Sequence, residues 1–313
     1  MYRISISLLF LCVALPAARA SDTLAFWRGA VDSADRTPPA AIELSPGHMV
    51  FSGPGGAPCH ALKASSVALC SMAVVHIQEA EVGPGTAAGA APRDGFLHLY
   101  LSWLPSDLAP APYTVTGLPE KTRYCLYRSV QCASRAMGVL PLCGDTVSPK
   151  VGLVGEGLGG FAALVLAALR PDTVGFVVLH QPAPIYHFPP SGLALHGAAR
   201  AATPFDPKLA QLVASGQCTE DRLRLALADF DAVALARYVR CPVLVVYNDS
   251  DPRAPTSALN DLYAALAGPK DAIRFAQPGR IPFASVPDHG AFFATFANDV
   301  ITGQVAARLA RGR

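Results

Sequence analysis

The first part of the chain consists of short apolar runs separated by turn residues. Met49–Phe51 and Cys59–Leu62 flank a turn at Gly53–Gly56, a spacing that predicts an antiparallel hairpin. Val67 to Gln78 is rich in short apolar side chains and predicts one or two buried strands. A further strand is expected from Phe96 to Leu104, where a proline-rich stretch ends it.

From Tyr124 onward the period of the apolar residues becomes helical. Leu126, Val130, Ala133 and Met137 recur at steps of three and four, which places them on one face of a helix. Strands and helices then alternate, which predicts an α/β protein with a mostly parallel, doubly wound sheet covered on both faces. The expected elements are strands at Val151–Val154, Val174–Leu179, Val243–Tyr247 and Ala272–Ala276, and helices at Phe161–Leu169, Thr219–Tyr238, Ser257–Leu266 and Ala291–Leu309.

The N-terminus has the three-part pattern of a signal peptide. Arg3 precedes an apolar run from Ile4 to Leu15, and Ala18-Arg19-Ala20 supplies small residues for cleavage. We therefore expect a signal peptide at residues 1–20, a single domain at residues 21–313, and a secreted or periplasmic protein. No later stretch is apolar for long enough to insert stably into a membrane once the signal is removed.

Composition narrows the classes of partner. Apolar residues make up 51% of the chain, charged residues 15%, and the formal net charge is +2. With no block of positive charge, nucleic acid is not an expected partner. Residues 183–215, rich in Pro, Ala and Gly, are expected to form a small cap, and the oligomeric state stays open.

Seven cysteines remain after the signal peptide: Cys59, Cys70, Cys125, Cys132, Cys143, Cys218 and Cys241. An oxidising compartment would permit up to three disulfides and one free thiol. Several of these residues lie in apolar runs, so burial as small hydrophobic side chains is an equal alternative. Their spacing contains no C-x-x-C pattern and supports no metal site.

The strand at Val151–Val154 leads into Gly155-Glu156-Gly157-Leu158-Gly159-Gly160 and then into an apolar helix. A glycine-rich turn from strand to helix is the geometry of a nucleophile elbow, which presents its central residue beside the free N–H groups of the helix N-terminus. The central residue here is Gly157, which has no side chain and cannot form a covalent intermediate.

The same six residues also match the dinucleotide-binding pattern G-x-G-x-x-G. The next strand, however, ends at His180-Gln181 and supplies no acidic residue for a ribose. The pattern also lies in the middle of the chain, so we do not expect a nucleotide or any other cofactor.

Two further segments occupy the places where a hydrolase carries its acid and its base, in the order nucleophile, acid, histidine. Asp251 follows the strand that ends at Tyr247, with Asp249 as the alternative acid. His289, before the closing helix, occupies the position of the base. Taken singly, an aspartate after a strand is commonly a turn former and a loop histidine is commonly solvated.

From about Tyr124 to His289 the chain resembles the acetyl xylan esterase and cephalosporin-C deacetylase family of α/β-hydrolases. The most specific segments are residues 229–236, from Asp229 to Ala236, and residues 241–245, Cys241-Pro242-Val243-Leu244-Val245. The resemblance implies an α/β-hydrolase fold, an acetylated carbohydrate or small ester as ligand, and no cofactor. It makes Asp251 the triad acid and His289 the base, with Gly157 in place of the serine.

The resemblance weakens at two turns in the N-terminal part. The family's His-Gly-Tyr turn, which supplies an oxyanion donor, is replaced by Gln78-Glu79-Ala80. Its Arg-Gly-Gln-Gly turn is replaced by residues 103–105, Trp103-Leu104-Pro105. The implied oxyanion positions are therefore Leu158, after the elbow, and Glu79 and Ala80.

Three hypotheses about function follow from these residues. The chain is an inactive or severely impaired member that retains a ligand pocket, an active esterase whose elbow serine was replaced by Gly157, or a non-catalytic scaffold that binds a partner.

Overall fold

The computed structural model describes residues 22–38, 40–65, 67–78, 95–102, 115–182, 206–249, 251, 256–275, 295, 298 and 299. The predicted signal peptide at residues 1–20 and the position of His289 lie outside these ranges. Of the predicted helix at residues 291–309, three residues are described, and all three are helical.

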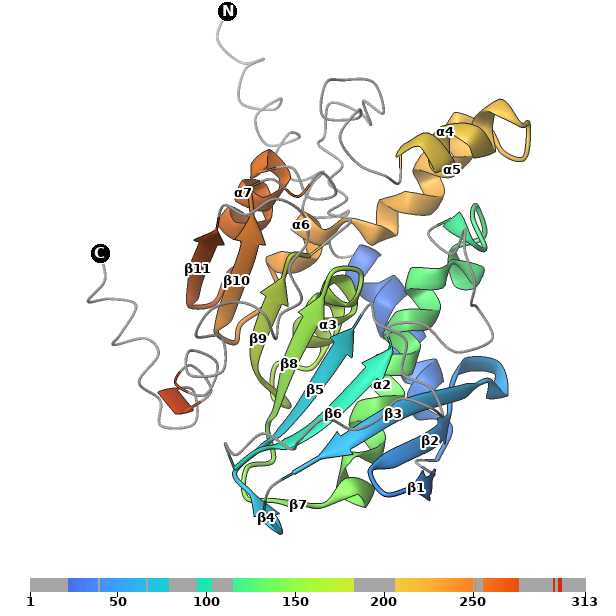
Figure 1. The fold of residues 1–313 in the computed structure, drawn as a ribbon. Helices are drawn as coiled ribbons and strands as arrows, with labels where there is room; N and C mark the ends of the chain where they lie inside the picture. The colour runs from blue at the N-terminus through green and yellow to red at the C-terminus, as the bar shows by residue number, and fades with distance from the viewer. Residues whose placement is uncertain are drawn as a thin grey trace, which may run out of the picture.

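The described residues form a nine-stranded sheet in the order β1-β2-β3-β6-β5-β8-β9-β10-β11 (Figure 1). Neighbouring strands run parallel from β6 to β11 and antiparallel from β1 to β6. The expected mixed sheet with an N-terminal antiparallel part is therefore confirmed. The strands are β1 Ala41–Ser45, β2 His48–Ser52, β3 Pro58–Ala64, β5 Ala73–Gln78, β6 Leu97–Ser102, β8 Val151–Glu156, β9 Val174–His180, β10 Val243–Asn248 and β11 Lys270–Phe275.

The predicted hairpin is formed by β2 and β3, with Met49 opposite Ala61 and Phe51 opposite Cys59. All four of these side chains are buried on the same face of the sheet. A separate two-stranded sheet pairs β4 (Leu69–Cys70) with β7 (Asp145–Thr146) at the opposite end of the strands from the β8–α3 turn.

The helices that connect the parallel strands along the chain pack against the sheet (Figure 1). The central helix α3 contacts β5, β8 and β9 and also packs against α2 and α6. The described helices are α2 Cys125–Cys143, α3 Gly159–Leu169, α4 Asp206–Ala214, α5 Glu220–Leu227, α6 Ala232–Ala236 and α7 Thr256–Ala265.

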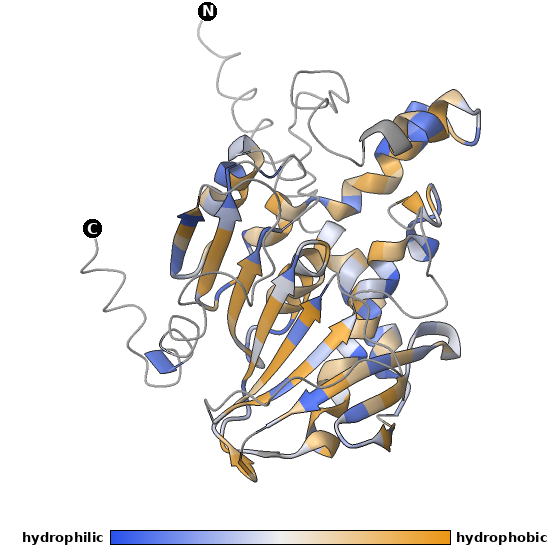
Figure 2. Cartoon of the chain, viewed as in Figure 1, coloured by the Kyte–Doolittle hydropathy of each residue, from blue (hydrophilic) through white to orange (hydrophobic). Residues whose placement is uncertain are grey.

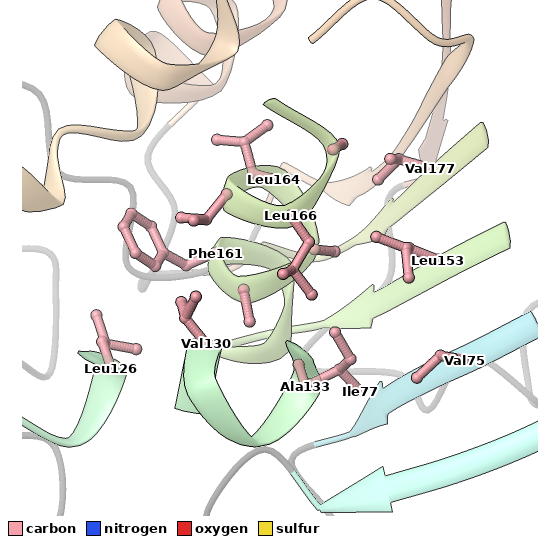
Figure 3. Close-up of a cluster of buried hydrophobic side chains, with 14 of the residues drawn as sticks. Val75, Ile77, Leu126, Val130, Ala133, Leu153, Phe161, Leu164, Leu166 and Val177 are labelled. Carbon is pink, nitrogen blue, oxygen red and sulfur yellow. The ribbon is translucent and has the colours of Figure 1, made fainter. Parts of the chain in front are cut away.

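The core has two layers because successive strand residues point to opposite faces of the sheet. On one face Val75, Leu153 and Val177 pack against apolar side chains of α3, and α2 lies beside it (Figure 3). On the other face Val74 and Phe176 belong to a second apolar cluster. The central strands are accordingly hydrophobic along most of their length (Figure 2), as expected for parallel strands buried on both faces.

The structure departs from the sequence predictions in several places, two of which concern helices. The single helix predicted at Thr219–Tyr238 is broken, because the Asp231 carboxylate accepts a hydrogen bond from the N–H of Ala234 at 2.9 Å and caps a new helix, α6. An additional helix covers residues 22–35. It buries Trp27, whose indole N–H donates to the carbonyl of Asp229 at 2.6 Å.

The sequence left two alternatives for the cysteines, disulfide pairing and burial as free thiols, and the structure shows both. Cys59 on β3 and Cys132 on α2 form a disulfide, which links the antiparallel strands to the helix layer. The other five are buried free thiols: Cys70, Cys125, Cys143, Cys218 and Cys241. Pairing therefore accounts for one disulfide, and burial accounts for the rest.

Candidate active site at the turn after strand β8

The chain passes from strand to helix through a two-residue turn. Strand β8 ends at Glu156, α3 begins at Gly159, and Gly157 lies at the tip with φ +55°. The Gly157 N–H donates to the carbonyl of His180 at 3.0 Å, and its own carbonyl accepts from the N–H of Gly160 at 3.0 Å. This left-handed conformation is the strained geometry of an elbow, and glycine adopts it without steric cost.

The flanking glycines are required by close packing. A Cβ on Gly159 would lie 2.1 Å from the carbonyl oxygen of Ile77, and a Cβ on Gly155 would lie 2.5 Å from the Cα of Gly160. A Cβ on Gly160 would lie 2.9 Å from the Cβ of Pro182. The helix N-terminus therefore sits against β5, β8 and the segment after β9 at a distance that only glycine permits.

Strand β5 ends beside the elbow. Ile77 is in register with Gly155 on β8, and Gln78 is the last residue of the strand. The chain thus leaves β5 next to the elbow, towards Glu79 and Ala80. Those two predicted oxyanion positions lie outside the described residues, and their role stays a prediction.

Leu158 belongs to the turn itself, where it is the N-cap residue of α3 with φ −60° and ψ −30°. Its side chain is buried in the main apolar cluster. A contribution of Leu158 to an oxyanion site would therefore have to come from its backbone N–H, and that role stays a prediction.

Gln181 is a feature of this region that the sequence analysis missed. It is buried directly after β9 and has φ +45°, which is unusual for a residue with a side chain. Its N–H donates to the carbonyl of Val246 at 2.7 Å, which holds the segment after β9 against β10. The preceding residue, His180, is in register with Glu156, so this strained backbone lies beside the elbow.

The two candidate acids after β10 have different surroundings. Asp249 forms an ion pair with Arg274 on β11, and this hydrogen bond and negative charge raise the pKa of the Arg274 guanidinium. Asp251 is 5% exposed, and its N–H donates to the carbonyl of Asn248 at 3.1 Å. Asp249 thus pairs with a residue of the edge strand β11, whereas Asp251 is buried in the turn that follows β10.

The described residues give no sign of a metal or a membrane anchor. Their His, Cys, Asp and Glu side chains form no group of three arranged to hold a metal ion. In the same part of the chain, no helix combines the length and the hydropathy needed to cross a bilayer.

Comparison with known proteins identifies the fold. The chain aligns with an acetyl xylan esterase from a Paenibacillus species with a TM-score of 0.68 and 17% identity, over 88% of this chain and 94% of that one. It aligns with acetyl xylan esterase 1 from a Thermoanaerobacterium species with a TM-score of 0.67 and 16% identity, over 89% and 93% of the two chains. An acylaminoacyl peptidase from Pyrococcus horikoshii gives a TM-score of 0.52 at 12% identity, covering 86% of this chain and 43% of that one.

This protein therefore has the α/β-hydrolase fold. Among solved structures, it is similar over nearly its whole length to acetyl xylan esterases. No family model matches the sequence, and no curated protein matches it. At 16–17% identity the likeness concerns the fold, and the chemistry of the site has to be argued from the residues.

Proposed function

We propose that this protein is a non-catalytic member of the α/β-hydrolase fold, exported from the cytoplasm, that binds an acetylated carbohydrate or another small ester at the turn after β8. The observation that carries the proposal is Gly157. It occupies the tip of an intact elbow, yet it has no side chain with which to form an acyl-enzyme. Removal of a triad nucleophile reduces turnover on the order of a million-fold.

The buried Asp251 favours a second candidate, an esterase silenced by a single substitution. Its position after β10, together with the engagement of Asp249 by Arg274, supports Asp251 as the former triad acid. In this candidate function, a serine at position 157 would attack the ester carbonyl, and His289 would accept the hydroxyl proton.

The two candidates are separated by restoring the nucleophile. The full chain, Gly157→Ser and Gly157→Ala are assayed side by side for hydrolysis of a chromogenic acetate ester. Gly157→Ala is the matched control, since alanine adds the same Cβ at the same φ without a hydroxyl. Circular dichroism and thermal melting establish that all three proteins are folded.

Under the proposal, neither the full chain nor the two variants turn the ester over, because Gln78-Glu79-Ala80 stands where the family has its His-Gly-Tyr turn, so the second oxyanion position is altered as well. Turnover by Gly157→Ser at roughly 1000-fold above Gly157→Ala, abolished by adding His289→Ala, would instead establish the silenced esterase. Turnover by the unmodified chain that His289→Ala abolishes would contradict the absence of catalysis.

Ligand binding is tested separately, with acetylated xylo-oligosaccharides and their deacetylated counterparts as matched probes. The expected result is a rise in melting temperature with the acetylated oligosaccharide that is smaller without the acetyl groups. Equal shifts with both probes, or none with either, would remove the acetyl ester from the proposal and favour the third hypothesis, a scaffold that binds a partner through another surface.

A further inference from the structure

A cavity lies at the opposite end of the strands from the elbow. Its volume is about 470 Å³, within the range typical of small-molecule sites. Its wall includes Leu97, the first residue of β6, and Cys143, the last residue of α2. Leu97 is in register with Ala73 at the start of β5, whereas the elbow contacts Ile77 near the end of the same strand. Four residues of extended chain separate them, about 13 Å, so the two sites are distinct.

The wall of this cavity combines apolar and polar surface, and Lys63 is the charged residue among those that line it. Val67, Ala68 and Leu97 contribute apolar surface, and Lys63 contributes an ammonium group. The exposed side chains of Val67 and Leu69 continue the apolar surface beyond the mouth. An apolar body with one anionic group would match this distribution of side chains.

Among the described residues, the ammonium group of Lys63 is only loosely engaged. Its nearest ion-pair contact is 3.8 Å to Oε2 of Glu43, and both side chains are partly exposed. The other carboxylate oxygen of Glu43, on β1, accepts a hydrogen bond from the N–H of Gly47 at 2.7 Å, so Glu43 contacts the β1–β2 turn without lining the cavity itself. Because a loose, partly exposed ion pair contributes little, a ligand carboxylate can replace Glu43 at Lys63 with little loss.

Two buried thiols can be used to detect a ligand in this cavity. Cys70 and Cys143 both line the cavity. Burial raises the pKa of the Cys143 thiol, the positive charge of Lys63 lowers it, and the negative charge of Glu43 raises it again. A ligand that occupies the cavity will therefore lie against groups whose alkylation can be followed residue by residue.

From this geometry we propose that the cavity between β3, β4, β6 and the end of α2 binds a small monocarboxylate with an apolar body, held by Lys63. The proposal is independent of the ligand at the elbow, because no residue is shared between the two sites. It gives the protein a binding function at the amino ends of the strands that does not require Gly157 or Asp251.

The probe is hexanoate, with hexanol and hexylamine as neutral and cationic controls of the same length, measured by titration calorimetry on the full chain. Hexanoate is expected to bind at one site at least tenfold more tightly than either control. Lys63→Met should weaken hexanoate binding at least tenfold, whereas Lys63→Arg and the exposed-residue control Lys150→Met should retain it.

Glu43→Gln gives a test of opposite sign, since removal of the competing carboxylate should tighten hexanoate binding several-fold. This variant keeps the proposal falsifiable if Lys63→Met does not fold. Mass spectrometry after alkylation locates the ligand: hexanoate should slow the modification of Cys70 and Cys143 and leave Cys125, which does not line the cavity, unchanged.

Three results would overturn the proposal: no difference between hexanoate and hexanol, equal affinity in the parent chain and Lys63→Met, or no protection of Cys70 and Cys143. Hexanoate binding that survives Lys63→Met without protecting either thiol would place the carboxylate elsewhere. None of these results bears on the elbow, whose test uses acetate esters and acetylated oligosaccharides.

Discussion

The two ends of the parallel strands differ in what they preserve. At the carboxyl ends, the turn after β8 keeps the backbone of a nucleophile elbow, with Gly157 at φ +55° and glycines packed against β5 and β9, but it lacks the nucleophilic side chain. At the amino ends, the chain brings an ammonium group and two thiols into one cavity without any recognisable motif. In this molecule, one site therefore has the backbone shape of a known motif without its reactive group, and the other has reactive groups without a known motif.

The comparison teaches that the elbow is maintained by packing. Gly159 and Gly160 fit between Ile77 and Pro182 whether or not residue 157 has a hydroxyl. The close α3–β8 contact is therefore enough to require these glycines, with or without catalysis. At the amino ends, by contrast, it is a chemical group, the ammonium of Lys63, on which the proposed ligand preference depends.

The largest effect is expected at Gly159. A Cβ there would lie 2.1 Å from the carbonyl oxygen of Ile77, a backbone atom that cannot move without distorting β5. Gly159→Ala should lower the free energy of unfolding by about 3 kcal/mol or more, measured by urea denaturation. A loss below about 1 kcal/mol would mean that the elbow is held less tightly than its packing indicates.

Gly138→Ala is the matched control for that experiment. Gly138 is an exposed residue within α2, and nothing lies within 4 Å of an added Cβ. The same substitution should here raise the free energy of unfolding by roughly 0.5–1 kcal/mol, because alanine is the better helix former. Opposite signs at the two glycines would separate steric packing from helix propensity.

The next largest effect is expected at Gly157, where a substitution meets an unfavourable backbone conformation. Gly157→Ala places a side chain at a positive φ and should lower the free energy of unfolding by about 1–2 kcal/mol. Gly157→Ser should cost a similar amount, so that any difference in ester turnover between the two variants reflects chemistry. Thermal and urea denaturation of both variants measures the cost, and an unchanged stability would show that the elbow relaxes its φ.

Much of the fold could be predicted from the sequence because its central strands are continuous apolar runs between glycine-rich turns. Val151–Val154 and Val243–Tyr247 were predicted within one or two residues of the ends of β8 and β10. The helix at residues 22–35 was missed, although Trp27, Ala30, Val31 and Ala34 recur at helical spacing and are buried. The helical spacing of these apolar residues was therefore visible in the sequence, directly after the predicted signal peptide.

Other features depend on contacts between distant residues and give no local signal. Strand β1 is an edge strand whose Ile42 and Leu44 are exposed, so its alternation does not mark a buried face. The break before α6 depends on whether Asp231 caps a helix or continues one. The elbow at position 157 was predicted from the glycine spacing, whereas the positive φ of Gln181, whose N–H donates to the carbonyl of Val246 on β10, has no counterpart in the local sequence.

A smaller effect is expected at the amino ends of the strands, where Lys63 serves binding more than stability. Because its contact with Glu43 is 3.8 Å long and partly exposed, Lys63→Met should change the free energy of unfolding by no more than about 0.5 kcal/mol. Urea denaturation alongside Gly159→Ala makes the contrast between the two ends direct. A loss above about 2 kcal/mol would reveal a structural role for Lys63 and weaken its assignment to a ligand.

The smallest effect is expected in the reactivity of Cys143. Lys63 lowers the pKa of this thiol against the larger raising effect of burial, so Lys63→Met should raise the pKa further and leave less thiolate at pH 8. Alkylation of Cys143 should slow roughly two-fold, a size suited to one charge near the protein surface. The thiol of Cys125, whose pKa is raised chiefly by burial, is the internal control and should not change. If Cys143 reacts at the same rate in both proteins, the charge of Lys63 does not reach the thiol, and the amino-end cavity loses the electrostatic feature that distinguishes it from an apolar void.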